Sequence, residues 1–138
     1  SWSPSTCGWF PGWIVQAKEE EIGEILLLNV HLRPPLPAGT GRPSITEYFS
    51  SRNDRKQDIE KWMQELQCFQ PDTKQIPVIV AGDFNEESIG KSGTFLRSIG
   101  LEDGIYQHDN SITWQWPLLY GWFSIWGRYD HIFYSTTN

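Results

Sequence analysis

The segment Gly82-Asp83-Phe84-Asn85 places a carboxylate and a carboxamide two residues apart, directly after the apolar run Val78-Ile79-Val80. In an extended backbone, side chains two positions apart project from the same face. A carboxylate can hold a hard divalent cation or orient a water molecule, and a neutral amide can donate to a phosphoryl oxygen. The segment therefore indicates phosphate chemistry, and the alternative is an Asx-type turn that closes a strand.

Two more polar residues interrupt apolar strand patterns. His31 lies near the end of one such pattern and shares a face with Asn29, whereas Asp130 opens another. A buried carboxylate is rarely tolerated without a partner, so Asp130 needs a donor such as a histidine or a backbone amide. The alternatives are a histidine satisfied within the core and an acid bonded to backbone at a strand edge. His131 alternates to the face opposite Asp130 and is interpreted as structural.

The hydrophobic pattern predicts the elements that carry these residues. The expected strands are Trp13–Lys18, Glu24–Leu32, Pro77–Ala81, Ile112–Gln115 and Tyr129–Ser135, and the expected helices are Ser92–Ile99 and a longer one from about Asn53 or Asp54 to Pro71-Asp72. The first two strands form a hairpin. The second is apolar on both faces until its carboxyl end, which is typical of a strand covered on both sides. Residues 1–12 are expected to be irregular, and the proline-rich residues 33–51 to form a long loop.

The positions of the three polar residues restrict the topology. His31 and Asp83 lie at the carboxyl ends of their strands, but Asp130 lies at the amino end of its own strand. They meet only if the last strand runs antiparallel to the others, which requires a mixed sheet. The alternation of strands and helices then predicts an α/β sandwich.

Length and charge restrict the class of protein. A chain of 138 residues suits one domain, and 38% hydrophobic and 14% aromatic residues exclude a disordered tail. The net charge of −6 argues against a broad basic surface for duplex nucleic acid, although it leaves room for a local basic groove. No apolar run is long enough to cross a membrane, and no targeting segment identifies a compartment. Because Met63 is the only methionine, we expect residue 1 not to be a translation start.

Three motifs of this sequence together resemble those of a known protein family. The motifs are Leu28-Asn29-Val30-His31-Leu32, Val80-Ala81-Gly82-Asp83-Phe84-Asn85 and Arg128-Tyr129-Asp130-His131-Ile132-Phe133. In type, order and spacing they resemble the endonuclease/exonuclease/phosphatase superfamily, which includes DNase I-like nucleases, abasic-site endonucleases, inositol polyphosphate 5-phosphatases and neutral sphingomyelinases. The resemblance implies a DNase I-like two-sheet α/β sandwich with mixed sheets, of which residues 1–138 form a single partial domain, roughly its second half. It also implies a magnesium-dependent phosphoesterase that attacks a phosphodiester or phosphomonoester with water.

The resemblance assigns roles to individual residues. The implied catalytic residues are His31, Asp83, Asn85 and Asp130, with Asn29 and Arg33 as substrate-binding residues and Asp83 also as a metal ligand. His31 would contact the scissile phosphate, Asp83 would position water or a metal, and Asn85 would hold a phosphoryl oxygen. Asp130 would orient a catalytic histidine. The implied cofactor is Mg²⁺ or Mn²⁺, and the implied substrate is a phosphate ester of a nucleic acid, a nucleotide, or a phospholipid or inositol head group.

The chain departs from the family pattern in two places. The early Asn and the metal-binding Glu of the first strands have no counterpart, and the terminal Ser-Asp-His would lie beyond Asn138. We therefore expect the isolated chain to bind magnesium weakly and to be catalytically incomplete. The alternative is a non-catalytic binding platform that retains the fold. A strand ending in Gln-Glu before Ser1 and a late Ser-Asp-His in the parent protein would favour the enzyme.

Two further groups of residues have open interpretations. The basic residues in and after the loop that follows His31 either meet phosphates or are solvated, and they are Arg33, Arg42, Arg52, Arg55 and Lys56. The tryptophans after Thr113 either stack on bases or lipids or pack in the core and loops, and they are Trp114, Trp116, Trp122 and Trp126. For both groups, the solvated or packed arrangement is the expected one.

Overall fold

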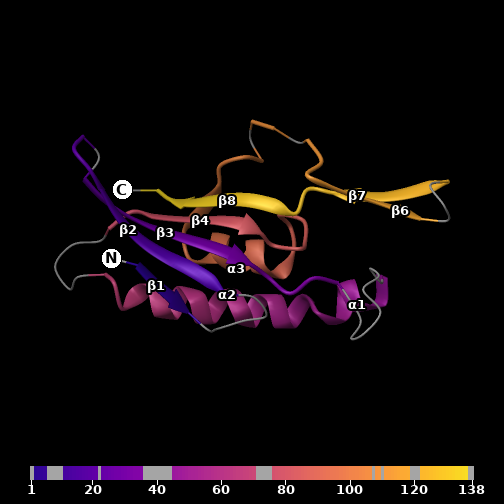
Figure 1. Cartoon of the computed structure of the whole chain (residues 1–138), viewed down its shortest axis with the longest axis horizontal. Helices are drawn as coiled ribbons and strands as arrows, with labels where there is room; N and C mark the ends of the chain where they lie inside the picture. Colours follow the sequence, from indigo (N-terminus) through magenta and orange to yellow (C-terminus); the bar gives the residue numbers. More distant parts are fainter. Residues whose placement is uncertain are drawn as a thin grey trace.

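The computed structural model describes residues 2–5, 11–21, 23–35, 45–70, 76–106, 108–109, 111–118 and 122–136. The strands are β1 (Trp2–Ser5), β2 (Gly12–Glu19), β3 (Gly23–His31), β4 (Val78–Asp83), β5 (Leu101–Asp103), β6 (Trp114–Leu118), β7 (Phe123–Gly127) and β8 (Asp130–Ser135). The helices are α1 (Ile45–Ser50), α2 (Arg52–Gln67) and α3 (Lys91–Ser98). One mixed sheet has the order β1-β2-β3-β4-β8-β5, and β6 pairs with β7 in a second sheet (Figure 1). The predicted α/β class with a mixed sheet is confirmed.

The register of the central strands aligns their polar ends. β3 pairs with β4 in parallel, with His31 opposite Asp83, and β4 pairs with β8 in antiparallel, with Asp83 opposite Asp130. The last strand therefore runs in the direction that the sequence analysis requires. Because paired residues project from the same face of a sheet, the register alone places the three polar side chains together at one end.

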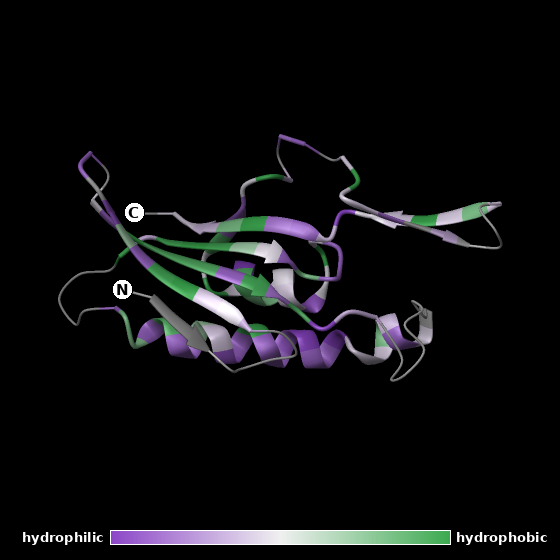
Figure 2. Ribbon diagram, viewed as in Figure 1, coloured by the Kyte–Doolittle hydropathy of each residue, from purple (hydrophilic) through white to green (hydrophobic). Residues whose placement is uncertain are grey.

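One hydrophobic cluster joins the helices to the sheet. The periodic residues predicted on α2 are all buried, and they are Ile59, Trp62, Met63 and Leu66. They share the cluster with strand and α3 residues that include Ile14, Leu26, Leu28, Val30, Val80, Leu96 and Phe133. Each such side chain contributes about 1.5–3 kcal/mol when it leaves water. Figure 2 shows the apolar stretches running along the central strands beside α2.

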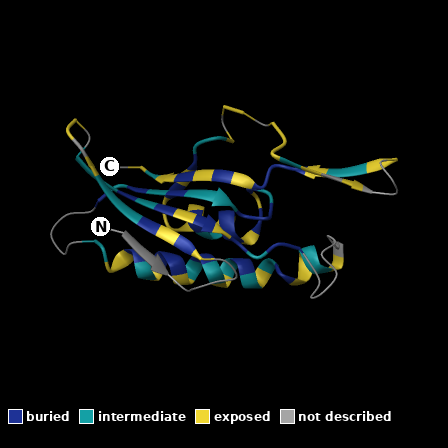
Figure 3. Ribbon diagram, in the orientation of Figure 1, coloured by how far each residue is buried: buried dark blue, intermediate teal, exposed yellow. Residues whose placement is uncertain are grey.

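The opposite face of the large sheet is covered less completely. Trp13 of β2 and both Ile132 and Tyr134 of β8 are exposed on this face. Figure 3 shows the resulting alternation of buried and exposed residues along β8. The expectation that β3 is covered on both sides is therefore wrong for the described residues. One face of β3 is buried against the helix layer, whereas the other has partly buried residues and the exposed Asn29 and His31.

Several predicted boundaries at the beginning of the chain are wrong. The segment expected to be irregular contains β1, which pairs with β2 at the edge of the sheet, a position that tolerates Pro4. The loop expected over residues 33–51 contains α1, and its residues 36–44 lie outside the described part of the chain. α2 ends at Gln67, ahead of the predicted end at Pro71-Asp72, which also lies outside the described residues.

The boundaries differ in the second half as well. β5 and β7 are strands that the hydrophobic pattern does not predict, because β5 has only three residues and β7 is interrupted by Ser124. β6 begins at Trp114, two residues after the start of the predicted strand. Within the described residues, no helix has the length and apolar character needed to cross a membrane.

Candidate functional site

Polar side chains meet at the carboxyl ends of β3 and β4. The Nε2 atom of His31 lies 3.7 Å from Oδ2 of Asp83, and Asp130 stands opposite Asp83 in the register of β4 and β8. The side chains of His31 and Asp83 are 46% and 33% exposed, so a ligand can reach both. Asn29 lies on the same face of β3, and its Nδ2 donates to the carbonyl oxygen of Ala81 at 3.5 Å. The structure therefore brings together three of the four predicted catalytic residues, with Asn29 beside them.

The turn after β4 orients the carboxylate of Asp83. The backbone N–H of Asn85 donates to Oδ1 of Asp83 at 2.8 Å, so the Asx-type turn and the candidate site use the same side chain. The other oxygen faces His31. Gly82 has a φ of 139°, and a Cβ atom there would lie 2.0 Å from the carbonyl oxygen of Val30. Any larger residue would force β3 and β4 apart, so this glycine is required by the close approach of the two backbones.

Burial and a neighbouring negative charge both act on Asp83. Burial raises the pKa of its carboxyl group, the hydrogen bond from Asn85 lowers it, the charge of Asp130 raises it, and His31 lowers it. The net result is a pKa above the ordinary value of 3.8. Two carboxylates at one sheet end repel each other. A cation beside them would offset that repulsion, so the electrostatics of this end favour a positive ligand.

The other two predicted site residues have partners within the protein. The amide of Asn85 is buried, and its Nδ2 donates to the carbonyl oxygen of Leu32 at 2.8 Å. Arg33 donates from Nη1 to Asp54 at 2.6 Å and from Nη2 to Glu47 at 3.3 Å. Their roles toward a substrate stay predictions. To hold a phosphoryl oxygen, Asn85 would have to use the second N–H of its amide. To bind a substrate phosphate, Arg33 would have to exchange a contact with Asp54 or Glu47 for one with the substrate.

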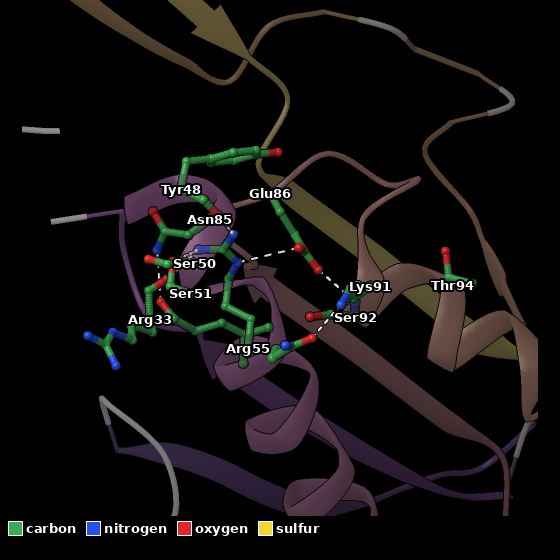
Figure 4. A network of polar contacts seen from close by, with 12 residues as sticks. Arg33, Tyr48, Ser50, Ser51, Arg55, Asn85, Glu86, Lys91, Ser92 and Thr94 are labelled. Carbon is green, nitrogen blue, oxygen red and sulfur yellow. Dashed lines mark hydrogen bonds and ion pairs between the residues drawn. The ribbon is translucent and has the colours of Figure 1, made fainter. Parts of the chain in front are cut away.

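A buried ion pair lies behind this turn (Figure 4), so the expectation that Arg55 is solvated is wrong. Arg55 of α2 and Glu86 are both fully buried, with Nε of Arg55 3.4 Å from Oε2 of Glu86. The second carboxylate oxygen of Glu86 accepts the backbone N–H of Ser92 at 2.6 Å. The other guanidinium nitrogens of Arg55 donate to the Arg33 carbonyl oxygen at 3.3 Å, the Ser51 hydroxyl at 2.6 Å and the Tyr48 carbonyl oxygen at 2.7 Å.

Arg55 thereby connects the loop after β3, the turn after β4 and the end of α1. An unpaired buried charge costs several kcal/mol, so these contacts hold the three segments in one arrangement. One signal in the sequence points to this role. Arg55 precedes Ile59 by four residues and Trp62 by seven, so the helical spacing places a charged residue on the buried face of α2.

A second buried polar cluster surrounds Asp103 on β5, on the other side of β8. Oδ2 of Asp103 accepts the Ser88 hydroxyl at 2.5 Å and the Arg128 guanidinium at 3.2 Å, and it lies 3.5 Å from Nδ1 of His131. Nε2 of His131 lies 2.9 Å from the carbonyl oxygen of Glu86, so His131 is buried and structural, as predicted. Burial raises the pKa of Asp103, but the hydrogen bond from Ser88 and the charges of His131 and Arg128 outweigh it and hold that pKa below its ordinary value.

The tryptophans in and beside the small sheet differ in how far they are packed against the rest of the protein. Trp114 of β6 packs against Tyr129 with ring centroids 5.3 Å apart, but Trp122 and Trp126 are 83% and 61% exposed. The side chain of Trp116 lies outside the described residues. The expectation of packing is therefore wrong for Trp122 and Trp126, because the hairpin of β6 and β7 extends away from the large sheet (Figure 1).

Residues 20–138 match the Endonuclease/Exonuclease/phosphatase family. The chain belongs to this family. It is a family of hydrolytic phosphoesterases and nucleases, and all three sequence motifs lie within the matched residues. No curated protein sequence matches the chain.

Solved structures show the DNase I-like fold of the family. The catalytic domain of human Nocturnin with bound sulfate aligns with a TM-score of 0.61 at 20% identity, over 91% of this chain and 41% of that chain. TDP2 from Caenorhabditis elegans aligns with a TM-score of 0.58 at 15% identity, over 92% and 36%. A mannosyl-6-phosphatase from Bacteroides thetaiotaomicron aligns with a TM-score of 0.56 at 22% identity, over 93% and 44%. The predicted fold is confirmed, and the chain spans less than half the length of these structures.

Endonuclease/exonuclease/phosphatase proteins generally depend on a divalent metal, and the described residues fit such a site in part. Asp83 and Asp130 stand opposite each other and supply hard carboxylate oxygens, the ligand type that Mg²⁺ prefers. Within the described residues, no three acidic, histidine or cysteine side chains are grouped closely enough to hold a metal ion. Asp83, the predicted metal ligand, would therefore supply only part of a ligand set, with the negative charge of Asp130 beside it.

Proposed function

We propose that this chain carries the His31, Asp83 and Asp130 part of the active site of a phosphoesterase that uses Mg²⁺ or Mn²⁺. The observation that carries the proposal is the 3.7 Å separation of His31 Nε2 and Asp83 Oδ2, with Asp130 opposite Asp83. The substrate is a phosphate ester of a nucleic acid, a nucleotide, or a phospholipid or inositol head group. Two solved structures of similar fold support this substrate class, since one binds the phosphate-like sulfate anion and another is named as a mannosyl-6-phosphatase.

Each side chain has a distinct task in this proposal. Asp83, whose Oδ1 is held by the Asn85 N–H, orients the attacking water or binds the metal through its accessible oxygen. His31, half-exposed on the neighbouring strand, donates to a phosphoryl oxygen or to the leaving oxygen. Asp130 orients a catalytic histidine. A bound metal would supply positive charge that offsets the negative charge developing on the phosphoryl oxygens.

We further propose that residues 1–138 form a partial domain. The chain spans 36–44% of the solved structures described above. In addition, the sheet face that carries His31 and Asp83 also carries the exposed apolar side chains of Trp13, Ile132 and Tyr134. An apolar sheet face is stable when a second layer covers it. A second sheet on this face would complete a sandwich and bring further metal ligands to the Asp83 end.

Hydrolysis by the full protein encoded with this sequence tests the proposed function. The substrates are bis-p-nitrophenyl phosphate, a diester, and p-nitrophenyl phosphate, a monoester, each with Mg²⁺ or with EDTA. We expect magnesium-stimulated turnover of at least one ester by the full protein and none by residues 1–138 alone. Turnover by the isolated chain would contradict the partial-domain proposal. If the full protein hydrolyses neither ester, a binding platform that retains the fold becomes the better assignment.

Magnesium binding by the isolated chain is a separate test. We expect calorimetry to show weak binding, because Asp83 is the one proposed protein ligand in this chain and leaves Mg²⁺ mostly bound by water. Asp83→Asn should abolish the remaining heat of binding. Micromolar affinity of residues 1–138 for Mg²⁺ would show that the chain carries a complete metal site.

A further inference from the structure

A cavity between α2 and α3 is lined by positively charged side chains, although the net charge of the chain is −6. Its volume is about 410 Å³, within the range of small-ligand sites. Arg52 and Lys56 of α2 and Lys91 of α3 line it, and none of its lining residues is acidic. The cavity is therefore an attractive place for an anion on an otherwise acidic protein.

Basic residues that lie close together in the sequence have different surroundings in the structure. Arg33 and Arg55 are held in ion pairs with carboxylates of the protein, and Arg42 lies outside the described residues. Arg52 and Lys56 line the cavity instead. Of the basic residues near the loop after His31, Arg52 and Lys56 are therefore the ones placed to contact phosphates. Lys91 of α3 lines the same cavity.

The existing partners of the two lysines are weak competitors for an anion. Nζ of Lys56 lies 3.1 Å from Oε1 of Glu60 in an exposed pair, and such pairs contribute about 0–1 kcal/mol. Lys91 donates to the neutral side-chain oxygen of Asn53. The Lys56 pair is exposed to water, and the partner of Lys91 carries no charge, so both lysines can still attract an anion. A phosphate oxygen can therefore replace the Glu60 contact or add to the Asn53 contact at little cost.

Apolar side chains accompany the cations. Ile89 and Phe95 line the same cavity, and Ile89 is 77% exposed. The guanidinium carbon of Arg52 lies 6.0 Å from the ring centroid of Phe49, which is 60% exposed. Within the described residues, the buried Nε atom of Arg52 has no hydrogen-bond partner. A ligand with alternating phosphate groups and planar rings could place its phosphates on the cations and its rings on the apolar side chains.

We propose that this cavity is a phosphate-binding site, separate from the Asp83 end, that holds the backbone of a single-stranded nucleic acid. Arg52, Lys56 and Lys91 contact phosphates, and a base packs against Phe95 and Ile89. The net charge of −6 disfavours a duplex, which needs a broad basic surface. The site is linked to the candidate active site through the loop after His31, because Arg33 of that loop pairs with the first turn of α2.

Fluorescence anisotropy with a fluorescein-labelled ten-residue oligothymidylate tests the proposal. The full protein is used in EDTA, so that binding is measured whether or not the protein hydrolyses phosphate esters. We expect Arg52→Gln/Lys56→Gln/Lys91→Gln to weaken binding by about tenfold or more. Lys61→Gln is the matched control, because Lys61 is exposed on α2 and does not line the cavity. It should leave the affinity within about twofold.

The salt dependence gives a second readout. Three cations on single-stranded phosphates predict a slope of log K against log salt near −2, and each single glutamine variant should reduce its magnitude by about 0.7. Lys91→Arg should retain binding. Circular dichroism checks the fold of the triple variant, and Lys56→Gln/Lys91→Gln serves if the triple variant is unfolded.

Three outcomes would overturn the proposal. They are absence of oligonucleotide binding by the wild-type protein, equal affinity of the wild-type and cavity variants, and equal loss in Lys61→Gln. Competition with inorganic phosphate distinguishes a polymer site from a small-anion site. If inorganic phosphate displaces the oligonucleotide at an equal concentration of phosphate groups, the cavity is a small-anion site and the nucleic-acid assignment is wrong.

Discussion

Asp83 and Asp103 lie on the strands that flank β8, and their surroundings act on them in opposite directions. Asp103 is buried, yet it accepts hydrogen bonds from Ser88 and Arg128 and lies beside His131, and its pKa is lowered. Asp83 is more exposed, but burial and the charge of Asp130 leave its pKa raised. A carboxylate whose acceptors are satisfied stabilises the fold. One that retains uncompensated negative charge at an accessible sheet end is suited to a cation or to acid–base chemistry.

Burial alone therefore does not identify a functional acid. The partners decide, because the donors and positive charges around Asp103 outweigh the effect of burial on its pKa, whereas burial and the like charge of Asp130 together outweigh the hydrogen bond to Asp83. Substitutions that separate activity from stability can therefore test each half of the comparison.

The largest effect is expected at Asp83. In the full protein, Asp83→Ala should lower the turnover of a phosphate ester by about 10²–10³-fold, because a preorganised electrostatic group of this kind acts mainly in the transition state. Steady-state kinetics measure the change. Glu102→Gln is the control, since Glu102 is exposed on β5. Turnover of Asp83→Ala within threefold of wild type would exclude Asp83 from the active site.

Asp103 should affect stability instead of chemistry. Asp103→Asn should lower the free energy of unfolding by about 2–4 kcal/mol, because Arg128 and His131 stay buried while losing a charged partner. Urea unfolding measures this loss, with Glu102→Gln again as the control. A loss no larger than that of the control would mean that Asp103 is not the centre of a stabilising cluster.

Asp130 should have a smaller effect, confined to turnover. Asp130→Asn should lower kcat of the full protein by roughly tenfold with little change in KM, because its proposed task is to orient a histidine and not to bind substrate. In residues 1–138 alone the same substitution should change nothing. A large rise in KM would assign Asp130 to substrate binding.

The smallest effect is expected in the pH dependence of stability. Because the pKa of Asp83 is raised in the folded protein, the folded state binds more protons than the unfolded state between 3.8 and that pKa. This group therefore lowers the free energy of unfolding as pH rises through the window, and the contribution levels off above it. Asp83→Asn should remove this decline in urea unfolding between about pH 3 and pH 7.

Asp103 should show the opposite sign in the same experiment. Its pKa is lowered, so its stabilisation is present above the unfolded value of 3.8 and is lost as pH falls through the folded pKa. Asp103→Asn should therefore weaken the loss of stability on acidification. If both variants change the pH profile in the same direction, the two clusters do not differ as the structure indicates.

The strand ends that carry His31, Asp83 and Asp130 could be predicted from the sequence alone. The apolar strand before Gly82-Asp83-Phe84-Asn85, the polar end of the strand with His31, and the acid that opens the last strand together required a mixed sheet with an antiparallel β8, and the structure confirms this. This part was predictable because the alternation of side chains and the place of a residue within its strand are local properties. They specify which end of a strand and which face a side chain occupies.

The burial of particular charged and aromatic side chains depends instead on contacts between elements that are distant in the sequence. Arg55 pairs with Glu86, 31 residues away, and no local pattern encodes that partner. Trp122 and Trp126 are exposed because their hairpin leaves the sheet, although their residue type favours burial. Arg52 and Lys56 line a cavity that α3 completes with Lys91, whereas nearby Arg33 and Arg55 form ion pairs. Partners distant in sequence are selected by packing, which local propensity does not specify.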